Sequence, residues 1–248
     1  MEQWQDQSII LAVRAHGEHG AIVSLLTAKH GRQAGYVRGA TSSKNRGTLE
    51  IGNVVDANWR ARTEESLGTL SLELSRSTAA RIMQDSQKLA ALQSACALCD
   101  QGLPEKEGHP GLYSGLTALF DILEQEIWAA GYIMWEIAFL KELGFSLDLT
   151  RCAGGGDAQT LTYVSPKTGC AVSEEAGEPY KEKLLHLPGF LKPIALPPDE
   201  EDILIGLQLT EYFLRHWVFA HHSRGLPTPR ERLSLRFDTQ SVKTEQTA

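Results

Sequence analysis

The sequence has few of the features that mark secreted or membrane proteins. Its four cysteines in 248 residues are too few for a disulfide framework. It has no apolar run of about 18 residues, which argues against a transmembrane helix. Its acidic start, residues 1–6, does not resemble a secretory signal. We therefore expect a cytoplasmic protein without a membrane partner.

Motifs for catalysis are also missing. The chain contains no G-x-S-x-G and no H-E-x-x-H sequence, and the glycines at 154–156 are not followed by Lys-Ser or Lys-Thr as a phosphate-binding loop requires. The acids at 199–202 fit a solvated helix start, where carboxylates interact favourably with the helix dipole. No set of catalytic residues remains, so we expect a protein that is not an enzyme.

Composition indicates an ordinary folded chain. Hydrophobic residues make up 42% and charged residues 22% of the sequence, which is typical of soluble domains, and a chain of this length can bury a sizeable core. The formal net charge is -7. Taken as a whole, this charge argues against a nucleic-acid partner.

The charge is, however, unevenly distributed. Residues 1–80 carry nine basic and eight acidic residues, whereas residues 81–248 carry fifteen basic and twenty-three acidic residues. No Asp or Glu lies between Glu18 and Glu50, although five basic residues do. Such a stretch is typical of a surface for a polyanion, but a solvated loop without acids fits it equally well. A second basic cluster, 215–236, has five arginines and one acid.

The first eighty residues read as short strands with glycine-containing turns. The five expected strands cover residues 9–13, 21–27, 32–38, 54–62 and 67–74. β-branched and aromatic residues favour strands, and five short strands in about 80 residues suit an OB-fold barrel. Residues 39–47 are too polar and too rich in Gly and Ser for a strand. We expect an OB-fold domain over residues 1–80.

Later in the chain the apolar residues recur at helical spacing. Helices are expected over residues 78–100, 112–125, 126–143 and about 198–222, whereas residues 150–180 are rich in Gly, Ser, Thr and Pro and should be irregular. The expected fold class is therefore α+β, with a five-stranded OB-fold barrel followed by an α-helical domain over residues 81–248.

The candidate binding residues come from the basic stretch and the strands beside it. A cationic groove with stacking aromatics is how OB-folds bind single strands. The candidate aromatics for stacking are Tyr36 and Trp59, although both could equally be barrel core. The candidate DNA-binding residues are Arg14, Lys29, Arg32, Arg38, Lys44, Arg46, Arg60 and Arg62. A candidate partner site or second DNA site comprises Arg215, His222, Arg224, Arg230 and Arg232.

The cysteines allow a competing reading as a zinc or redox protein. Cys96 and Cys99 have C-x-x-C spacing but fall on the apolar stripe of an expected helix, where cysteine packs as a small hydrophobe. Cys152 and Cys170 lie in the Gly-rich segment. A closed zinc site needs four ligands, so zinc is not expected, but metal analysis would decide.

Short motifs occur in a fixed order along nearly the whole chain. They are Asp6–Arg14, His16–Glu18, Val23–Arg32, Val37–Lys44, Leu49–Gly52, Leu143–Phe145, Tyr212–Arg215, His222 and Gly225–Glu231. Each motif is modest, but their order is specific, and together they resemble the bacterial recombination-mediator RecO family.

This resemblance implies a function that composition does not. Members of the family bind single- and double-stranded DNA, anneal complementary strands, and act with RecR to help RecA replace single-strand-binding protein, whose acidic C-terminal tail they contact. The resemblance thus implies a recombination mediator in DNA repair, associated with the nucleoid. The alternative is an adaptor that recruits repair factors through that tail and contacts DNA only weakly.

The chain departs from the family pattern at its zinc loop. Many members carry four zinc-binding cysteines after the Leu-Gly-Phe motif. Here Cys152 fits the first ligand position, Gly155 and Ser173 stand at other ligand positions, and the register of Cys170 is doubtful. The expectation is a loop held by packing rather than by zinc.

Overall fold

The computed structural model describes residues 1–63, 65–195 and 197–245, and the side chains of Lys44 and of residues 238–245 lie outside that description. The chain forms two compact units. The first comprises residues 1–124 and 227–233, and the second comprises residues 125–226 and the chain from residue 234 onward. The units do not follow the expected boundary at residue 80, because the first helices after the barrel pack with it.

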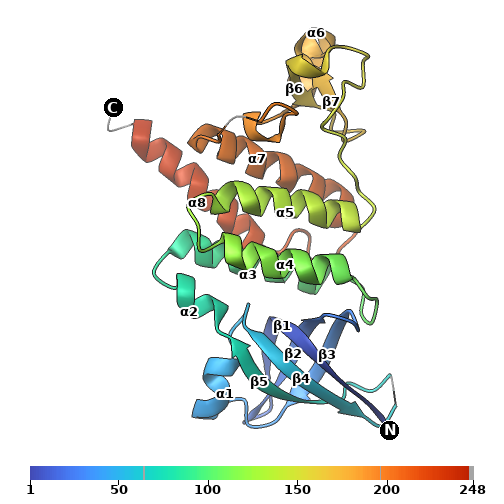
Figure 1. Ribbon diagram of the computed structural model, residues 1–248, viewed down its shortest axis with the longest axis vertical. Helices are drawn as coiled ribbons and strands as arrows, with labels where there is room; N and C mark the ends of the chain where they lie inside the picture. Colours follow the sequence, from blue (N-terminus) through green and yellow to red (C-terminus); the bar gives the residue numbers. More distant parts are fainter. Residues whose placement is uncertain (64, 196, 246–248) are drawn as a thin grey trace. The chain divides into compact units, whose positions relative to one another are not determined.

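The N-terminal strands form a closed barrel (Figure 1). They are β1 (Glu2–His16), β2 (Gly20–Thr27), β3 (Arg32–Val37), β4 (Val54–Ala61) and β5 (Thr69–Arg76). Their order around the barrel is β1-β2-β3-β5-β4, with β4 returning to the first half of the long β1. This order confirms the expected OB-fold, in which one curved strand pairs on both sides and leaves no open edge.

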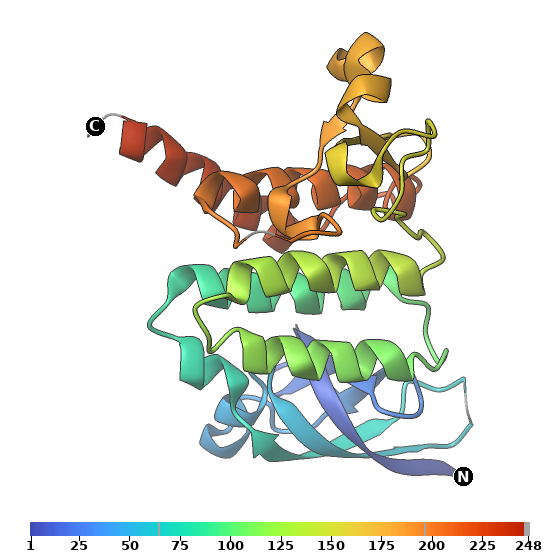
Figure 2. The ribbon, with the colours of Figure 1, turned by 45° about the horizontal axis from the view of Figure 1, so that its top comes forward.

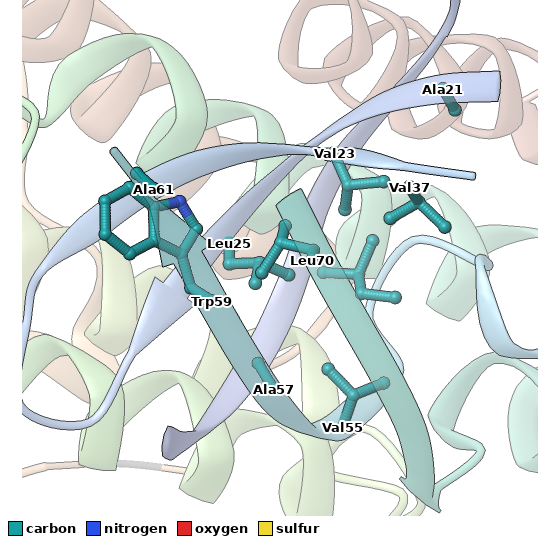
Figure 3. Close-up of a cluster of buried hydrophobic side chains, with 10 residues drawn as sticks. Ala21, Val23, Leu25, Val37, Val55, Ala57, Trp59, Ala61 and Leu70 are labelled. Carbon is teal, nitrogen blue, oxygen red and sulfur yellow. The ribbon is translucent and has the colours of Figure 1, made fainter. Parts of the chain in front are cut away.

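The barrel interior is filled by alternate side chains from these strands. Val23 and Leu25 of β2, Val55 and Trp59 of β4 and Leu70 of β5 belong to one buried cluster (Figure 3). Trp59 is only 3% exposed, and its indole Nε1–H donates to the carbonyl oxygens of Ala34 (3.2 Å) and Leu67 (3.1 Å). The ring is therefore packed in the core, and its only polar atom is hydrogen-bonded inside the barrel.

The polar loop after β3 contains a short helix. Helix α1 (Ser43–Thr48) begins after Ser42, whose hydroxyl accepts a hydrogen bond from the Asn45 N–H. Both ribbon views show α1 on the outside of the barrel (Figures 1 and 2). Local capping by a serine is sufficient to start such a turn.

Three helices complete the first unit, α2 (Thr78–Ile82), α3 (Ser86–Gly102) and α4 (Pro110–Ile122). The expected single helix over 78–100 is wrong, because the chain breaks at 83–85. There the Asp85 carboxylate accepts hydrogen bonds from the backbone N–H groups of Gln87 (2.9 Å) and Lys88 (3.1 Å) and starts α3 anew. Aspartate is a favoured N-cap residue for this reason.

The second unit is built on α5 (Trp128–Glu142) and α7 (Glu200–Phe213), which pack together. Between them the buried Glu136 accepts hydrogen bonds from the hydroxyls of Tyr132 (2.7 Å) and Thr210 (2.5 Å). Helix α8 (Thr228–Glu245) was not expected from the sequence. None of the helices in the described ranges is long and apolar enough to cross a membrane.

Residues 150–180 are not irregular as expected. They contain β6 (Leu161–Val164), β7 (Ala171–Ser173) and the short helix α6 (Glu174–Gly177), and β8 (Leu185–His186) completes a three-stranded antiparallel sheet. The strands are too short to show a period of two, so the turn residues around them dominated the sequence pattern. The expected helix over 198–222 ends as α-helix at Phe213 and continues as a π-helical turn over 214–218.

The barrel core provides a test of Trp59. Replacing Trp59 with Ala should lower the free energy of unfolding by about 3–5 kcal/mol, because a large buried ring is lost and a cavity remains. Urea unfolding measures this, with Arg60→Ala, an exposed neighbour on the same strand, as the control. Equal stability of the two variants would contradict the buried role of Trp59.

Candidate nucleic-acid interface

One row of residues crosses all five strands on the outer face of the barrel. The strand registers pair Arg14 with Ile22, Ile22 with Tyr36, Tyr36 with Thr69, and Thr69 with Arg60. Directly paired residues on adjacent strands point to the same face. We call these five residues the Tyr36 row. It has one arginine on each side of the tyrosine, two strands and therefore about 10 Å away along the sheet.

Tyr36 lies at the centre of this row and is half-buried. Its ring lies across Gly20, where a Cβ atom would overlap the phenol. The His16 ring approaches it edge-on at 6.0 Å. Gly20 therefore allows the tyrosine to lie close against β2, and His16 and Tyr36 together form an aromatic surface outside the barrel core.

The two predicted stacking residues thus have different places. Tyr36 is on the outer face, where a base could reach it, and its stacking role stays a prediction. Trp59 is in the core with both indole hydrogen-bond contacts made inside the barrel. The prediction that Trp59 stacks on DNA is therefore wrong, because a ligand cannot reach a ring that is 3% exposed.

Asp100 on α3 forms ion pairs with two of the predicted DNA-binding residues, Arg14 and Arg32. Its side chain is 4% exposed and lies 2.7 Å from the Arg14 guanidinium and 3.9 Å from that of Arg32. Arg32 also donates from Nε to the Leu103 carbonyl (2.8 Å) and pairs with Glu105 (3.3 Å). Arg14 stays 63% exposed, whereas Arg32 is 17% exposed.

The assignment of Arg32 to DNA contact is therefore corrected. Its guanidinium is already used by a carbonyl and two carboxylates, and releasing it would leave a nearly buried carboxylate poorly paired. Arg14 keeps an exposed surface despite its ion pair. It is thus the end of the Tyr36 row at which charge is partly neutralised.

Three further predicted residues, Arg38, Arg60 and Arg62, are exposed and have no ion pair within the described residues. Arg38 follows Tyr36 by two positions, beside the β1–β2 turn, since the Ala40 N–H donates to the His19 carbonyl (2.7 Å). Arg60 belongs to the Tyr36 row, and Arg62 follows it by two positions. Their roles in binding stay predictions.

The last three predicted residues, Lys29, Lys44 and Arg46, lie outside the strands that form the Tyr36 row. Lys29 is on the β2–β3 turn, at the opposite end of β2 from Gly20. Arg46 is on α1, and its guanidinium lies 3.4 Å from the Thr41 carbonyl. The side chain of Lys44 is outside the described part of the structure. Residue spacing did not show that Lys29 is separate from the Tyr36 row, whereas α1 lies beside the end of β3, since the Asn45 side-chain amide donates to the Arg38 carbonyl (3.3 Å).

Two adjoining cavities border the row beyond Arg60. The smaller, about 330 Å³, is lined by Gln3, Trp4, Gln5, Asn58 and Arg60 and has no carboxylate. The larger, about 580 Å³, is lined partly by Asp6, Asp56 and Glu73. Because carboxylates repel phosphates, the larger cavity marks where the surface suited to a nucleic acid ends.

The predicted C-terminal site is divided between the two units. Arg215, His222 and Arg224 are exposed on the second unit, whereas Arg232 is exposed on the segment of the first unit at 227–233. Arg230 is fully buried. Its assignment to a surface site is wrong, because a side chain with no exposed area cannot contact a partner.

On the second unit, Arg215 lies on the π-helical turn and pairs with Glu211 (2.9 Å). The neighbouring His216 stacks on Tyr212 with ring centroids 4.1 Å apart, and Trp217 packs against Phe213 at 4.5 Å. Sequence reasoning missed His216 as part of this surface. Its spacing of four from Tyr212 was the available signal, since residues four apart are neighbours on a helix.

The four cysteines have contrasting environments. Burial raises the pKa of the Cys96 and Cys99 thiols well above the usual range, as expected for core residues of α3. Burial also acts to raise the pKa of Cys152, but hydrogen bonds from Ser173, Gly156 and Gly154 outweigh it and lower the pKa to about 7. Cys152 is therefore the thiol that is most readily ionised by its surroundings.

The lowered pKa of Cys152 should be visible in how fast the thiol reacts at different pH values. Its thiolate is the species that reacts, so alkylation by iodoacetamide should rise as the pH increases through about 7 and then level off. The rate is measured in a Cys170→Ala variant, with the Cys152→Ala, Cys170→Ala double variant as the blank. A rate that keeps rising until the pH passes 9.0, the ordinary value for this thiol, would contradict the hydrogen-bonded environment.

A five-stranded OB-fold barrel extended by helices, with a cationic and aromatic row on its outer face, places the chain among OB-fold proteins with a candidate oligonucleotide surface. The family models described as Recombination protein O N terminal and Recombination protein O C terminal match residues 1–78 and 83–224. The chain therefore belongs to the RecO family. This membership supports a role in recombinational DNA repair.

Curated relatives agree with this assignment. The chain is 49% identical over 237 residues to DNA repair protein RecO of Rhodospirillum centenum, covering 95% of this chain and 94% of that protein. It is 44% identical over 243 residues to DNA repair protein RecO of Rhodospirillum rubrum, covering 95% and 96%. The protein of the same name from Jannaschia sp. is 42% identical over 241 residues, covering 97% and 98%.

Proposed function

We propose that this protein binds single-stranded DNA across the Tyr36 row and acts, without catalysing a reaction, as a mediator of recombinational DNA repair. The observation that carries the proposal is the row itself. It places Arg14 and Arg60 on opposite sides of the half-buried Tyr36 on the outer face of the barrel, and none of its five members is acidic. Backbone neutralisation combined with base stacking is how OB-folds bind single strands.

The chemistry of the row favours a single strand over a duplex. A base must be unstacked from its neighbours to lie on the Tyr36 ring, and only a single strand allows this without breaking base pairs. Arg38 and Arg62, which follow members of the row by two positions, extend the cationic surface for the phosphates. Duplex DNA would contact only these cations, through its backbone.

This arrangement suits strand annealing. Most nucleotides would be held through their phosphates, so their base edges stay available for pairing with a second strand. The carboxylates of the 580 Å³ cavity would limit how far a strand wraps around the barrel. Cooperation with RecR, assistance to RecA and a nucleoid-associated location in the cytoplasm follow from the family resemblance and form part of the proposal.

The Tyr36 row predicts the effect of removing its ring. Tyr36→Ala should weaken binding of a single-stranded oligonucleotide by about 1–3 kcal/mol, or roughly 5- to 150-fold, because the stacking surface is lost. Tyr36→Phe keeps the ring and should bind like the unmodified protein. Gly20→Ala displaces the ring without removing it and should also weaken binding, measured by fluorescence anisotropy.

The cations are tested separately by salt dependence. Replacing Arg38, Arg60 and Arg62 with Gln should reduce the slope of log affinity against log salt by about 2, since each single-strand phosphate contact contributes about 0.7. The matched control replaces Arg81, Lys141 and Arg151, which are exposed and are not candidate DNA-binding residues. An unchanged slope in the first variant, or an equal loss in both, would contradict the proposed surface.

The second candidate function is an adaptor that binds the acidic C-terminal tail of single-strand-binding protein. It rests on the surface of the second unit around Arg215, where no Asp or Glu occurs between Glu211 and Glu231. An arginine beside the aromatic side chains of Tyr212 and Trp217 combines charge attraction with an apolar anchor, as in many binding hot spots. The two functions are compatible because they use different units.

A tail peptide tests the adaptor function. Arg215→Glu should lower its affinity at least about tenfold, because a charge-assisted contact becomes repulsive. Arg151→Glu, an exposed arginine of the same unit, should leave the affinity unchanged. Oligonucleotide binding should not change in either variant. Loss of peptide binding in both variants would show a non-specific charge effect and contradict the site.

A further inference from the structure

The residues of this chain do not fit the zinc site that the family resemblance implies. A structural zinc ion needs four protein ligands, usually cysteine or histidine. Across the described residues, no group of three or more His, Cys, Asp and Glu side chains could hold a metal. The Cys170 sulfur lies 3.7 Å from the Thr168 carbonyl oxygen. The backbone of Cys170 forms an isolated β-bridge with that of Asp148.

The sulfur of Cys152 instead forms hydrogen bonds with Ser173. The backbone N–H of Ser173 donates to it at 3.2 Å, and the thiol donates to the Ser173 hydroxyl oxygen at 3.4 Å. The sulfur also lies close to Gly154 and Gly156, whose backbone N–H groups help to lower the pKa of the thiol. One serine and two glycines therefore surround this sulfur, whereas a metal site would bring four sulfur or nitrogen atoms to one ion.

The same contacts connect three parts of the local fold. Ser173 ends β7 and is the N-cap of α6, with its hydroxyl accepting from the Ala176 N–H at 3.4 Å. Ala153 donates to the Ala171 carbonyl (2.9 Å) and so aligns the Cys152 loop with β7. A Cβ atom at Gly156 would overlap the Ser173 hydroxyl, so glycine is needed for the close approach.

We infer that hydrogen bonds to the Cys152 sulfur replace the metal in this chain and hold the segment 150–177 in a fold that does not depend on zinc. We call Cys152, Ser173, Gly154 and Gly156 the Cys152 pin. The inference is independent of the proposed DNA function. It assigns Ser173 a definite role, since this serine stands where a ligand cysteine would stand and bonds to the sulfur through both its N–H and its hydroxyl oxygen.

The experiment combines metal analysis with hydrogen exchange on the full chain. The protein is produced in zinc-supplemented medium, and its zinc content is measured by mass spectrometry. We expect far less than one zinc ion per chain and the same Tm with and without EDTA. In Cys152→Ala, the Ser173 amide should exchange roughly tenfold faster, the equivalent of one lost hydrogen bond, whereas Cys170→Ala should leave its exchange unchanged.

The outcomes decide between a pin and a metal site. One zinc ion per chain, or a Tm that falls with EDTA, would overturn the inference, and so would unchanged exchange at Ser173 in Cys152→Ala. If Cys152→Ala does not fold, the unmodified protein is alkylated at Cys152 with N-ethylmaleimide, and faster exchange at Ser173 is again expected. Unchanged exchange after complete alkylation would also overturn it.

Discussion

The buried carboxylate of Asp100 is the interaction on which the arrangement of the first unit depends. It lies between Arg14 and Arg32 and is 4% exposed, so it joins the end of α3 to two strands of the barrel, β1 and β3. A buried carboxylate is stable only when cations and donors surround it. This requirement commits Arg32 to the structure and leaves Arg14 at the margin of the accessible surface.

Four exposed arginines, Arg14, Arg38, Arg60 and Arg62, lie in the Tyr36 row or two positions beyond a member of it. The barrel registers place Tyr36 between Arg14 and Arg60, and Gly20 gives the ring room to lie against β2. The net charge of -7 therefore does not describe the surface that a strand would meet. In the proposed binding mode, contact with DNA would be limited to a few cations on a small part of the barrel, with carboxylates nearby.

The sequence predicted the barrel well because alternation and glycine turns are local signals. The same signals could not separate Tyr36 from Trp59, since both are aromatic residues on expected strands beside arginines. Their difference arises from which face of the strand closes over the core. The Arg32 assignment failed for a related reason, because its partners Asp100, Leu103 and Glu105 are about 70 residues away in the chain.

The sequence by itself determined three things about this protein. Strand periodicity indicated the OB-fold, helical periodicity indicated the mainly helical part that follows, and the ordered motifs indicated the family. The sequence also identified Arg14, Tyr36 and Arg60 as candidates, but not as neighbours. Only the tertiary structure decided that these three share one row, that Arg230 and Trp59 are buried, and that Ser173 meets Cys152. The reason is physical: sequence patterns report each residue's preference, whereas exposure and partners depend on strand register and on contacts between distant segments.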